Sequence, residues 1–380
     1  MERLIQASAD QHVPARYDLI VVGGGPGGAS TAITAARSGA RVLLLERGRL
    51  PRQRICGEFV SAEALDLLAD LLGDSAPSLL AGVVRISQAR LFVDGRTILT
   101  PVRPAAASVA RFDLDAVLWH AGEAAGVDAR LETNVERVDH AGTFLVRTSA
   151  GNFQARAVVK ATGRWSNLDR PPNRAPGPAE RWLGLKAHFA EPSHPPSVDL
   201  YFFEGGYCGV QPVTLAATRE NDGRINACAM VRADVARSLP EVFAQHPQLR
   251  DRSSRWEPLM EPVSTSPLQF HEPQAVQNRM LQVGDSAGFV DPFVGDGISL
   301  ALRSGAAAAD CLRPFFRGDA SLDESAQRYA QIYQSRLLPV FRNSSKLRRL
   351  LRLPKALRVP IAHLLENTPT VTRYLVSMTR

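Results

Sequence analysis

Cysteine is scarce in this chain, and long apolar runs are missing. The cysteines form neither a C-x-x-C pair nor a cysteine–histidine pattern with zinc-ligand spacing, so we expect no metal site. No uninterrupted apolar run reaches the roughly 18 residues that a membrane-spanning helix needs. The N-terminal sequence MERLIQASADQHVPARYDL lacks the basic and apolar regions of a secretory signal. These absences favour a protein of the reducing cytoplasm.

Charge excludes a further class of partner. The 380 residues carry a net charge of +7, but no recognisable nucleic-acid-binding module accompanies it, so we expect no nucleic acid partner. Part of the basic excess lies in residues 341–380. This C-terminal stretch either makes peripheral contact with an anionic membrane surface or packs on the body of the protein with its basic face in solvent. The length of the chain suits two or three domains.

The most informative stretch runs from Tyr17 to Gly48 and reads YDLIVVGGGPGGASTAITAARSGARVLLLERG. Its apolar and small residues predict a buried strand, a helix and a second strand at residues 17–22, 27–38 and 41–45. Between the first strand and the helix, Gly23, Gly25 and Gly28 form the pattern G-x-G-x-x-G. A glycine turn in this context is typical of a dinucleotide-binding fingerprint.

Each glycine of the pattern has a physical reason. Gly23 permits a tight turn off the strand, Gly25 lets the backbone approach a pyrophosphate, and Gly28 lets the helix pack closely on the sheet. The N-terminus of the helix offers free N–H groups and a partial positive charge to that pyrophosphate. Glu46 follows 23 positions after Gly23, where a carboxylate accepts hydrogen bonds from a ribose and disfavours a 2′-phosphate.

The rest of the chain predicts further elements. Ser61 is the expected N-cap of a helix over 62–72, and Arg111 lies just before a helix over 114–125. Asp94-Gly95 and Asn221-Asp222-Gly223 predict hairpin turns. The other predicted segments are a domain crossing at Trp165 to Pro178, antiparallel strands within 182–235, a helix at 236–250, a return strand with loops at 254–274 and a helix at 322–340.

A second glycine turn lies in RMLQVGDSAGFVDPFVGDGISLALRSG. Residues 280–283 predict a strand that ends at Gly284, and the carboxylate of Asp285 can accept hydrogen bonds from sugar hydroxyls. A long helix follows Gly297, and its first N–H groups point at an anion. In a flavin enzyme that anion would be the N1–C2=O edge of the reduced ring. The alternative is an ordinary loop–helix turn with Asp296 as the N-cap.

With both turns placed, the chain resembles, over residues 16–375, a flavoprotein superfamily of aromatic hydroxylases (group A flavin monooxygenases), geranylgeranyl reductases and flavin halogenases. Similarity is greatest to the geranylgeranyl-reductase-like branch. The motifs that carry the resemblance are GGGPGG at 23–28, RICGE at 54–58, Arg111 before its helix, ATGRWS at 161–166 and GDSAGFVDPFVGDGI at 284–298. The resemblance implies FAD as the cofactor.

The predicted fold class is α/β, with a Rossmann-type FAD-binding domain (GR2-like), an antiparallel-sheet substrate domain and a C-terminal helical segment. The expected domains are 16–165 with 275–330 for FAD, 166–274 for substrate, with 80–104 contributing to it, and 331–380 for the C-terminal helices. The implied cofactor-binding residues are Gly23, Gly25, Gly27, Gly28, Glu46, Arg47, Cys56, Gly57, Arg111, Val135, Asp285, Gly297 and Ile298. Among them, the resemblance places Arg111 at the FAD diphosphate and Val135 over the adenine.

Three functions are compatible with these residues. In a monooxygenase, reduced FAD and oxygen form a hydroperoxide that hydroxylates or epoxidises a hydrophobic or aromatic small molecule. In a reductase, the flavin gives hydride to a carbon–carbon double bond, and Tyr207 or Cys56 would serve as the acid. The third is a flavin-containing binding protein without turnover. NAD(P)H is the expected electron donor for either enzyme.

Three departures from family patterns rank these functions. The halogenases' W-x-W-x-I-P stretch is not found. The segment that matches the prenyl reductases' Y-x-W-x-F-P is YCGVQP, with Gly209 and Gln211 at the two aromatic positions. The hydroxylases' D-G pair is Thr162-Gly163 here. We expect a monooxygenase first and a double-bond reductase as the alternative.

Overall fold

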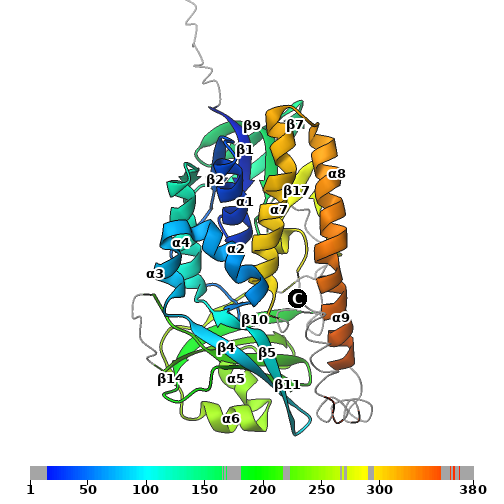
Figure 1. Cartoon of the computed structure of the whole chain (residues 1–380). Coiled ribbons are helices and arrows are strands. Elements are labelled where there is room, and N and C mark those ends of the chain that lie inside the picture. The colour runs from blue at the N-terminus through cyan, green and yellow to red at the C-terminus, as the bar shows by residue number, and fades with distance from the viewer. Residues whose placement is uncertain are drawn as a thin grey trace, which may run out of the picture.

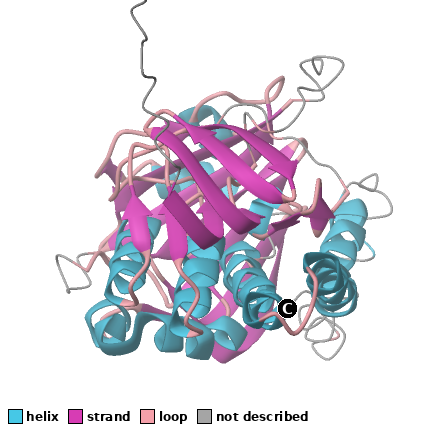
Figure 2. Ribbon diagram, turned by 90° about the horizontal axis from the view of Figure 1, so that it is seen from above, coloured by secondary structure: helices cyan, strands magenta, loops and turns pink. Residues whose placement is uncertain are grey.

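The computed structural model of the chain describes residues 15–164, 181–216, 223–265, 272–289 and 295–351, and the single positions 166, 168, 268, 360, 363 and 368. Two sheets lie one above the other, and Figure 1 shows the one that contains β1 at the top and the one that contains β4 and β10 at the bottom. Seen from above, most of the helical ribbon lies on one side of the strands (Figure 2).

β1 (Ala15–Val22) lies inside the first sheet, between β9 and β2. Its apolar side chains are buried, as is typical of an interior parallel strand. It pairs in parallel with β2 (Val42–Leu45) and β9 (Gly151–Lys160). The strand order is β16-β17-β9-β1-β2-β6, with β7 and β8 paired beside β9. The outer strands are β6 (Asp128–Arg130), β7 (Val135–Ala141), β8 (Thr143–Thr148), β16 (Val276–Gln277) and β17 (Met280–Gln282). The predicted α/β fold class is confirmed.

Two helices pack together beside this sheet because glycines let their backbones approach. α1 (Pro26–Arg37) follows the first glycine turn, and α7 (Gly297–Arg317) follows the second. A Cβ at Gly305 would lie only 2.3 Å from the carbonyl oxygen of Gly27. The other helices of this layer are α2 (Ala62–Leu72), a 3₁₀ turn (Gly73–Ser75), α3 (Ala76–Leu80) and α4 (Arg111–Ala124).

The second sheet has the order β14-β10-β13-β12-β11-β4-β5-β3, with β15 beside β10. It is mostly antiparallel, but β11 and β4 run parallel. Its strands are β3 (Phe59–Val60), β4 (Val84–Val93), β5 (Arg96–Ser108), β10 (Trp182–Ala190), β11 (Ser197–Phe203), β12 (Gly206–Pro212), β13 (Arg224–Arg232), β14 (Glu257–Pro258) and β15 (Val263–Ser264). The hairpin predicted at Asp94-Gly95 joins β4 to β5.

Three predicted elements differ in the structure. The single helix expected at 236–250 is two helices, α5 (Leu239–Ala244) and α6 (Pro247–Ser253), because Pro247 forces His246 into an extended conformation. The return strand at 254–274 is reduced to β14 and β15, of two residues each. Arg111 is the first residue of α4 rather than a residue before it.

The C-terminal helices run along the side of the molecule beside α7 (Figure 1). The helix expected at 322–340 is α8 (Leu322–Ile332), a π-helical turn (Tyr333–Leu337) and α9 (Leu338–Leu351). Of the remaining predictions, most of the crossing at Trp165 to Pro178, the turn residues Asn221-Asp222 and most of the basic stretch after 351 fall outside the described residues. None of the described helices combines the length and apolar character that crossing a membrane requires.

Candidate functional site

The three glycines of the first turn differ in what surrounds them. Gly23 has φ +112, and a Cβ there would lie 2.3 Å from the carbonyl oxygen of Ala161. A Cβ at Gly28 would lie 1.8 Å from the carbonyl oxygen of Gly23. By contrast, the nearest atom of the described residues to a Cβ at Gly25 is Nη2 of Arg111, at 3.9 Å. The turn is therefore tight on its protein side and open at Gly25, where α1 begins.

Glu46 is buried at the end of β2, where its carboxylate is already hydrogen-bonded. Oε2 accepts from the backbone N–H of Gly24 at 3.0 Å, and Oε1 accepts from Gly48 N–H at 2.9 Å and from Arg52 at 2.6 Å. Burial raises the pKa of this carboxyl, but Arg52 and the two N–H groups outweigh burial and hold the pKa below its ordinary value. The sequence predicted the carboxylate but not its partner Arg52.

One cavity of about 720 Å³ joins the two glycine turns to the second sheet. That volume is typical of cofactor and ligand sites, which span roughly 300–1,000 Å³. The cavity brings together, as lining residues, the predicted residues Gly23, Gly25, Gly27, Glu46, Arg47, Cys56, Gly57, Arg111, Val135, Tyr207, Asp285, Gly297 and Ile298. Gly28 is not among its lining residues because it lies buried in the packing beneath the turn.

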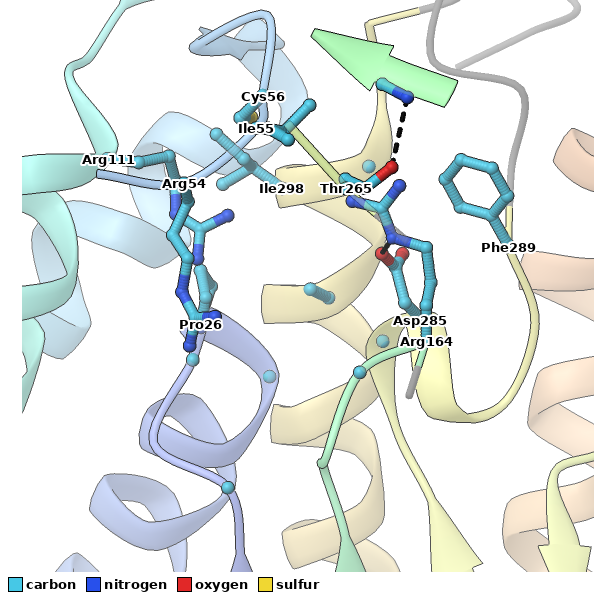
Figure 3. A pocket seen from close by; sticks show the side chains of 18 of the residues that line it. Pro26, Arg54, Ile55, Cys56, Arg111, Arg164, Thr265, Asp285, Phe289 and Ile298 are labelled. Atoms are coloured by element: carbon cyan, nitrogen blue, oxygen red, sulfur yellow. Dashed lines mark hydrogen bonds and ion pairs between the residues drawn. The ribbon is translucent and has the colours of Figure 1, made fainter. Parts of the chain in front are cut away.

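Arg54 and Arg111 lie on one side of this cavity, above Pro26 at the start of α1 (Figure 3). Arg111 donates two hydrogen bonds of 2.7 Å to Asp115. Burial lowers the pKa of Arg111, but Asp115 outweighs it and raises the pKa above the ordinary range. Nε of Arg54 is buried and has no hydrogen-bond partner among the described residues. Sequence reasoning assigned no role to Arg54, although it begins the quoted RICGE motif.

Asp285 lies on the other side of the cavity, in a short 3₁₀ turn (Gly284–Ser286) after β17. Its Oδ2 is 3.1 Å from Nε of Arg164, whose guanidinium lies 4.4 Å from the centre of the Phe289 ring. Figure 3 shows these three side chains together, across the cavity from Arg54. The sequence predicted a role for Asp285 but none for Arg164, which follows Gly163 in the quoted ATGRWS motif.

The two predicted helix caps, Ser61 of α2 and Asp296 of α7, bond differently from the prediction. Ser61 and Asp296 occupy N-cap positions, but neither side chain bonds the backbone of its own helix. Instead, the Ser61 hydroxyl donates to Oδ1 of Asp296 at 2.8 Å and also lies 2.8 Å from Oγ of Ser299. Burial raises the pKa of Asp296 to about 6, and its Oδ2 has no partner among the described residues. At Gly297, no atom of the described residues lies within 4 Å of a Cβ position, so this helix start is open on the side that the structure describes.

The end of the cavity against the second sheet is mainly apolar. Tyr207 on β12 reaches it, together with the apolar side chains of Ile55, Met230, Leu268 and Phe289. The thiols of Cys56 and Cys228 also line the cavity. Burial raises the pKa of the Cys228 thiol to about 12, so this group is protonated at neutral pH. Tyr207 and Cys56, both predicted as candidate acids, therefore share one cavity.

These residues fit FAD. The two open glycine positions, Gly25 and Gly297, mark where a ligand can approach the starts of α1 and α7. Arg54 adds a buried N–H without a partner among the described residues, beside the start of α1. The carboxylate of Glu46 lines the same cavity, at the position where a ribose is expected.

Comparison with known proteins agrees with this geometry. A profile of the family described as FAD binding domain matches residues 16–337. Digeranylgeranylglycerophospholipid reductase 1 of Methanococcoides burtonii is 26% identical over 346 residues, covering 83% of this chain and 78% of its own. Menaquinone reductase of Mycolicibacterium smegmatis is 26% identical over 373 residues, covering 91% of this chain and 88% of its own. The structure of the flavin-dependent brominase Bmp2 has the same fold, with a TM-score of 0.76 at 19% identity, covering 96% of this chain and 93% of its own.

Proposed function

This chain belongs to the FAD binding domain family of FAD-dependent oxidoreductases, and we propose that it is a monooxygenase that hydroxylates or epoxidises a hydrophobic or aromatic small molecule. In the net reaction, molecular oxygen and NAD(P)H with one proton give the oxygenated substrate, water and NAD(P)⁺. One oxygen atom enters the substrate, and the other leaves as water. FAD supplies the redox chemistry when bound, so the protein must orient the substrate and exclude water.

The composition of the cavity's end against the second sheet, where we place the substrate, carries this proposal. Its described lining combines apolar side chains with the phenol of Tyr207, the two cysteines, and the hydroxyl residues Ser264 and Thr265, and it includes neither lysine nor histidine. Glu58 also lines the cavity, but it is paired with the buried Lys186. A site without a free acid–base pair suits a reaction whose chemistry comes from the cofactor.

Halogenation is disfavoured because the flavin halogenases resemble one another through a lysine that carries the oxidant, and the described cavity lining offers no such lysine. Lys186 is fully buried, and its Nζ lies 2.5 Å from the Glu58 carboxylate. No lysine belongs to the described lining of the cavity.

Long-chain prenyl reduction is disfavoured by β12. Tyr207, Gly209 and Gln211 alternate along this strand and so share one face. A Cβ at Gly209 would lie 3.3 Å from Leu200, and the amide of Gln211 donates to Ser108 at 2.7 Å. Only the tyrosine of the aromatic segment typical of prenyl reductases is present to line the cavity.

A double-bond reductase is the second candidate, and the names of the two reductases reported above favour it. In that reaction, the substrate double bond, NAD(P)H and one proton give the saturated product and NAD(P)⁺. Tyr207 or Cys56 would supply the proton, since both line the cavity.

Rapid mixing separates the two candidates. Protein reduced without oxygen is mixed with oxygenated buffer, with and without alkyl-substituted phenols or geranylgeraniol as probes, and flavin absorbance is followed. We expect a transient species before the oxidised spectrum, and isotope-labelled oxygen in the product. If the protein instead reduces the carbon–carbon double bond of the substrate under anaerobic conditions, and no label from oxygen enters the product, the reductase proposal would replace the monooxygenase proposal. Tyr207→Phe should impair turnover only if Tyr207 is the proton donor.

The remaining expectations stay proposals. We place the protein in the cytoplasm, with NAD(P)H visiting the FAD site transiently and with a small hydrophobic substrate as its partner. Peripheral membrane contact through the basic C-terminus is compatible with such a substrate. Sedimentation with vesicles of anionic lipid tests that contact directly.

A further inference from the structure

Glu58 lies between the loop that contains Cys56 and Gly57 and the first strand of the second sheet, β3. It is fully buried, although it immediately follows the cavity-lining pair Cys56-Gly57. Its φ is +61, in the left-handed region that few side chains adopt. Such a conformation persists when surrounding contacts determine it, and it is frequent at functional sites.

Three groups hold the Glu58 carboxylate. Oε1 accepts from Nζ of Lys186 at 2.5 Å and from the backbone N–H of Arg111 at 2.9 Å, and Oε2 lies 2.9 Å from Nε2 of His188. Burial raises the pKa of Glu58, but Lys186 and His188 outweigh it and lower the pKa to about 2. Lys186 and His188 both belong to β10, so one carboxylate connects this loop to the second sheet and to the first turn of α4.

The same loop has further contacts on each side of Glu58. Nζ of Lys186 also donates to Gln53 at 3.1 Å. The amide of Asn226 on β13 donates to the carbonyl of Cys56 at 3.0 Å, and the N–H of Glu58 donates to the Cys56 sulfur at 3.3 Å. These bonds place the Cys56 thiol relative to the sheet that bears Tyr207.

We propose that Glu58 is a positioning residue: held by Lys186 and His188 of the second sheet, it fixes Cys56-Gly57 in the lining of the cavity. This role goes beyond the proposed reaction, because a monooxygenase and a reductase would both need the loop in place. It also gives the buried Lys186 a function other than carrying an oxidant.

The alternative is that Glu58 is only the counter-ion of a buried lysine. Removing one partner of a buried ion pair destabilises a protein strongly, whereas replacing both partners with neutral groups often restores stability. The comparison therefore uses Glu58→Gln, Lys186→Met and the double variant, each prepared with FAD bound. The midpoint of thermal unfolding measures the stability of each variant. The rate of Cys56 alkylation by iodoacetamide, followed by peptide mass spectrometry, and the rate of FAD release measure how firmly the loop is held.

We expect Glu58→Gln to lower the unfolding midpoint and the double variant to recover it. In the double variant, Cys56 should still be alkylated, and FAD still released, about tenfold faster than in the wild type. Wild-type alkylation and release rates in a double variant that has recovered its stability would overturn the proposal and leave Glu58 as a counter-ion.

Two further variants keep the test decisive if the double variant does not fold. His188→Leu removes the contact between His188 and the Glu58 carboxylate but leaves the ion pair between Lys186 and Glu58 in place. This variant should accelerate Cys56 alkylation severalfold. An unchanged rate in His188→Leu would overturn the proposal. Glu191→Gln is the matched control, since it breaks an ion pair with Arg252 outside the described cavity lining. It should lower stability but leave the Cys56 rate unchanged.

Discussion

Gly25 and Gly28 belong to one motif, yet a methyl group at each would have opposite consequences. Gly28→Ala places a Cβ 1.8 Å from a backbone oxygen, so we expect α1 to separate from β1 and the unfolding midpoint to fall sharply. Gly25→Ala meets no atom of the described residues closer than 3.9 Å, so the variant should fold normally but bind FAD weakly. Thermal unfolding and fluorescence titration with FAD measure the two effects. Equal stability of the two variants would contradict this assignment.

Glu46 should contribute to FAD binding as a charged acceptor. Glu46→Gln removes the charge at nearly constant shape, and we expect a loss of about 1.5–3 kcal/mol in FAD affinity, roughly 10- to 150-fold in Kd. Equilibrium dialysis with FAD measures the change. Glu132→Gln is the control, because Glu132 is exposed and pairs with Arg49. Similar Kd values for the two variants would argue against a ribose contact at Glu46.

Short-range patterns explain which residues could be found from the sequence. Gly23, Gly25 and Glu46 were predicted because their spacing within one strand–helix–strand unit constrains where they lie. Arg54, Arg164 and Glu58 were not assigned roles because their surroundings come from distant parts of the chain. Glu58, for example, meets Lys186 across 128 positions. No local period or spacing contains such a contact.

The junction of α2 with α7 should make stability depend on pH. Burial raises the pKa of Asp296 to about 6 in the folded protein, above its value in the unfolded chain. The folded state therefore holds this proton more tightly, and the stability that the protonated group contributes is lost as pH rises from about 4 to about 7. Asp296→Asn should become more stable relative to the wild type over that range.

Urea unfolding at several pH values measures this difference. Asp323→Asn is the matched control, because Asp323 is exposed and pairs with Arg279 on the surface. A stability difference between Asp296→Asn and the wild type that does not change with pH would show that Asp296 is ionised throughout. The Ser61 hydroxyl, which donates to Asp296, can donate equally to the asparagine oxygen.

Helix boundaries were harder to predict than helix existence. The sequence predicted α2 to its last residue, but the hydroxyl of Ser61 serves a neighbouring helix rather than its own. A tertiary partner competes successfully with local capping because both ends of that bond are buried. The break at Pro247 could have been predicted from the sequence, since a proline restricts the residue before it. The π-helical turn at Tyr333–Leu337 has no sequence signal that we can identify.

The two glycine turns lie at the same edge of the first sheet. They follow β1 and β17, which both run parallel to β9, and parallel strands present their carboxyl ends at the same edge, where ligands bind. Through the motifs that carry the family resemblance, the sequence assigned Gly25 and Asp285 to one cofactor, and both residues line the same cavity. It could not predict the second sheet's order, because β11 pairs in parallel with β4 across more than 100 residues. Pairing over such a separation depends on packing rather than on local pattern.

FAD should stabilise the two sheets together. The cavity is lined by the glycine turns of the first sheet and by Gly184, Tyr207 and Met230 of the second. Because a ligand that binds only the folded state adds stability, FAD at about 100 times its Kd should contribute about 2.7 kcal/mol. We expect calorimetry of FAD-free protein to show one transition, whose midpoint rises by several degrees when FAD is added. Gly25→Ala should keep the transition and lose the rise. Two transitions, with only one shifted by FAD, would show that the sheets unfold independently and that the Glu58 contact does not couple them.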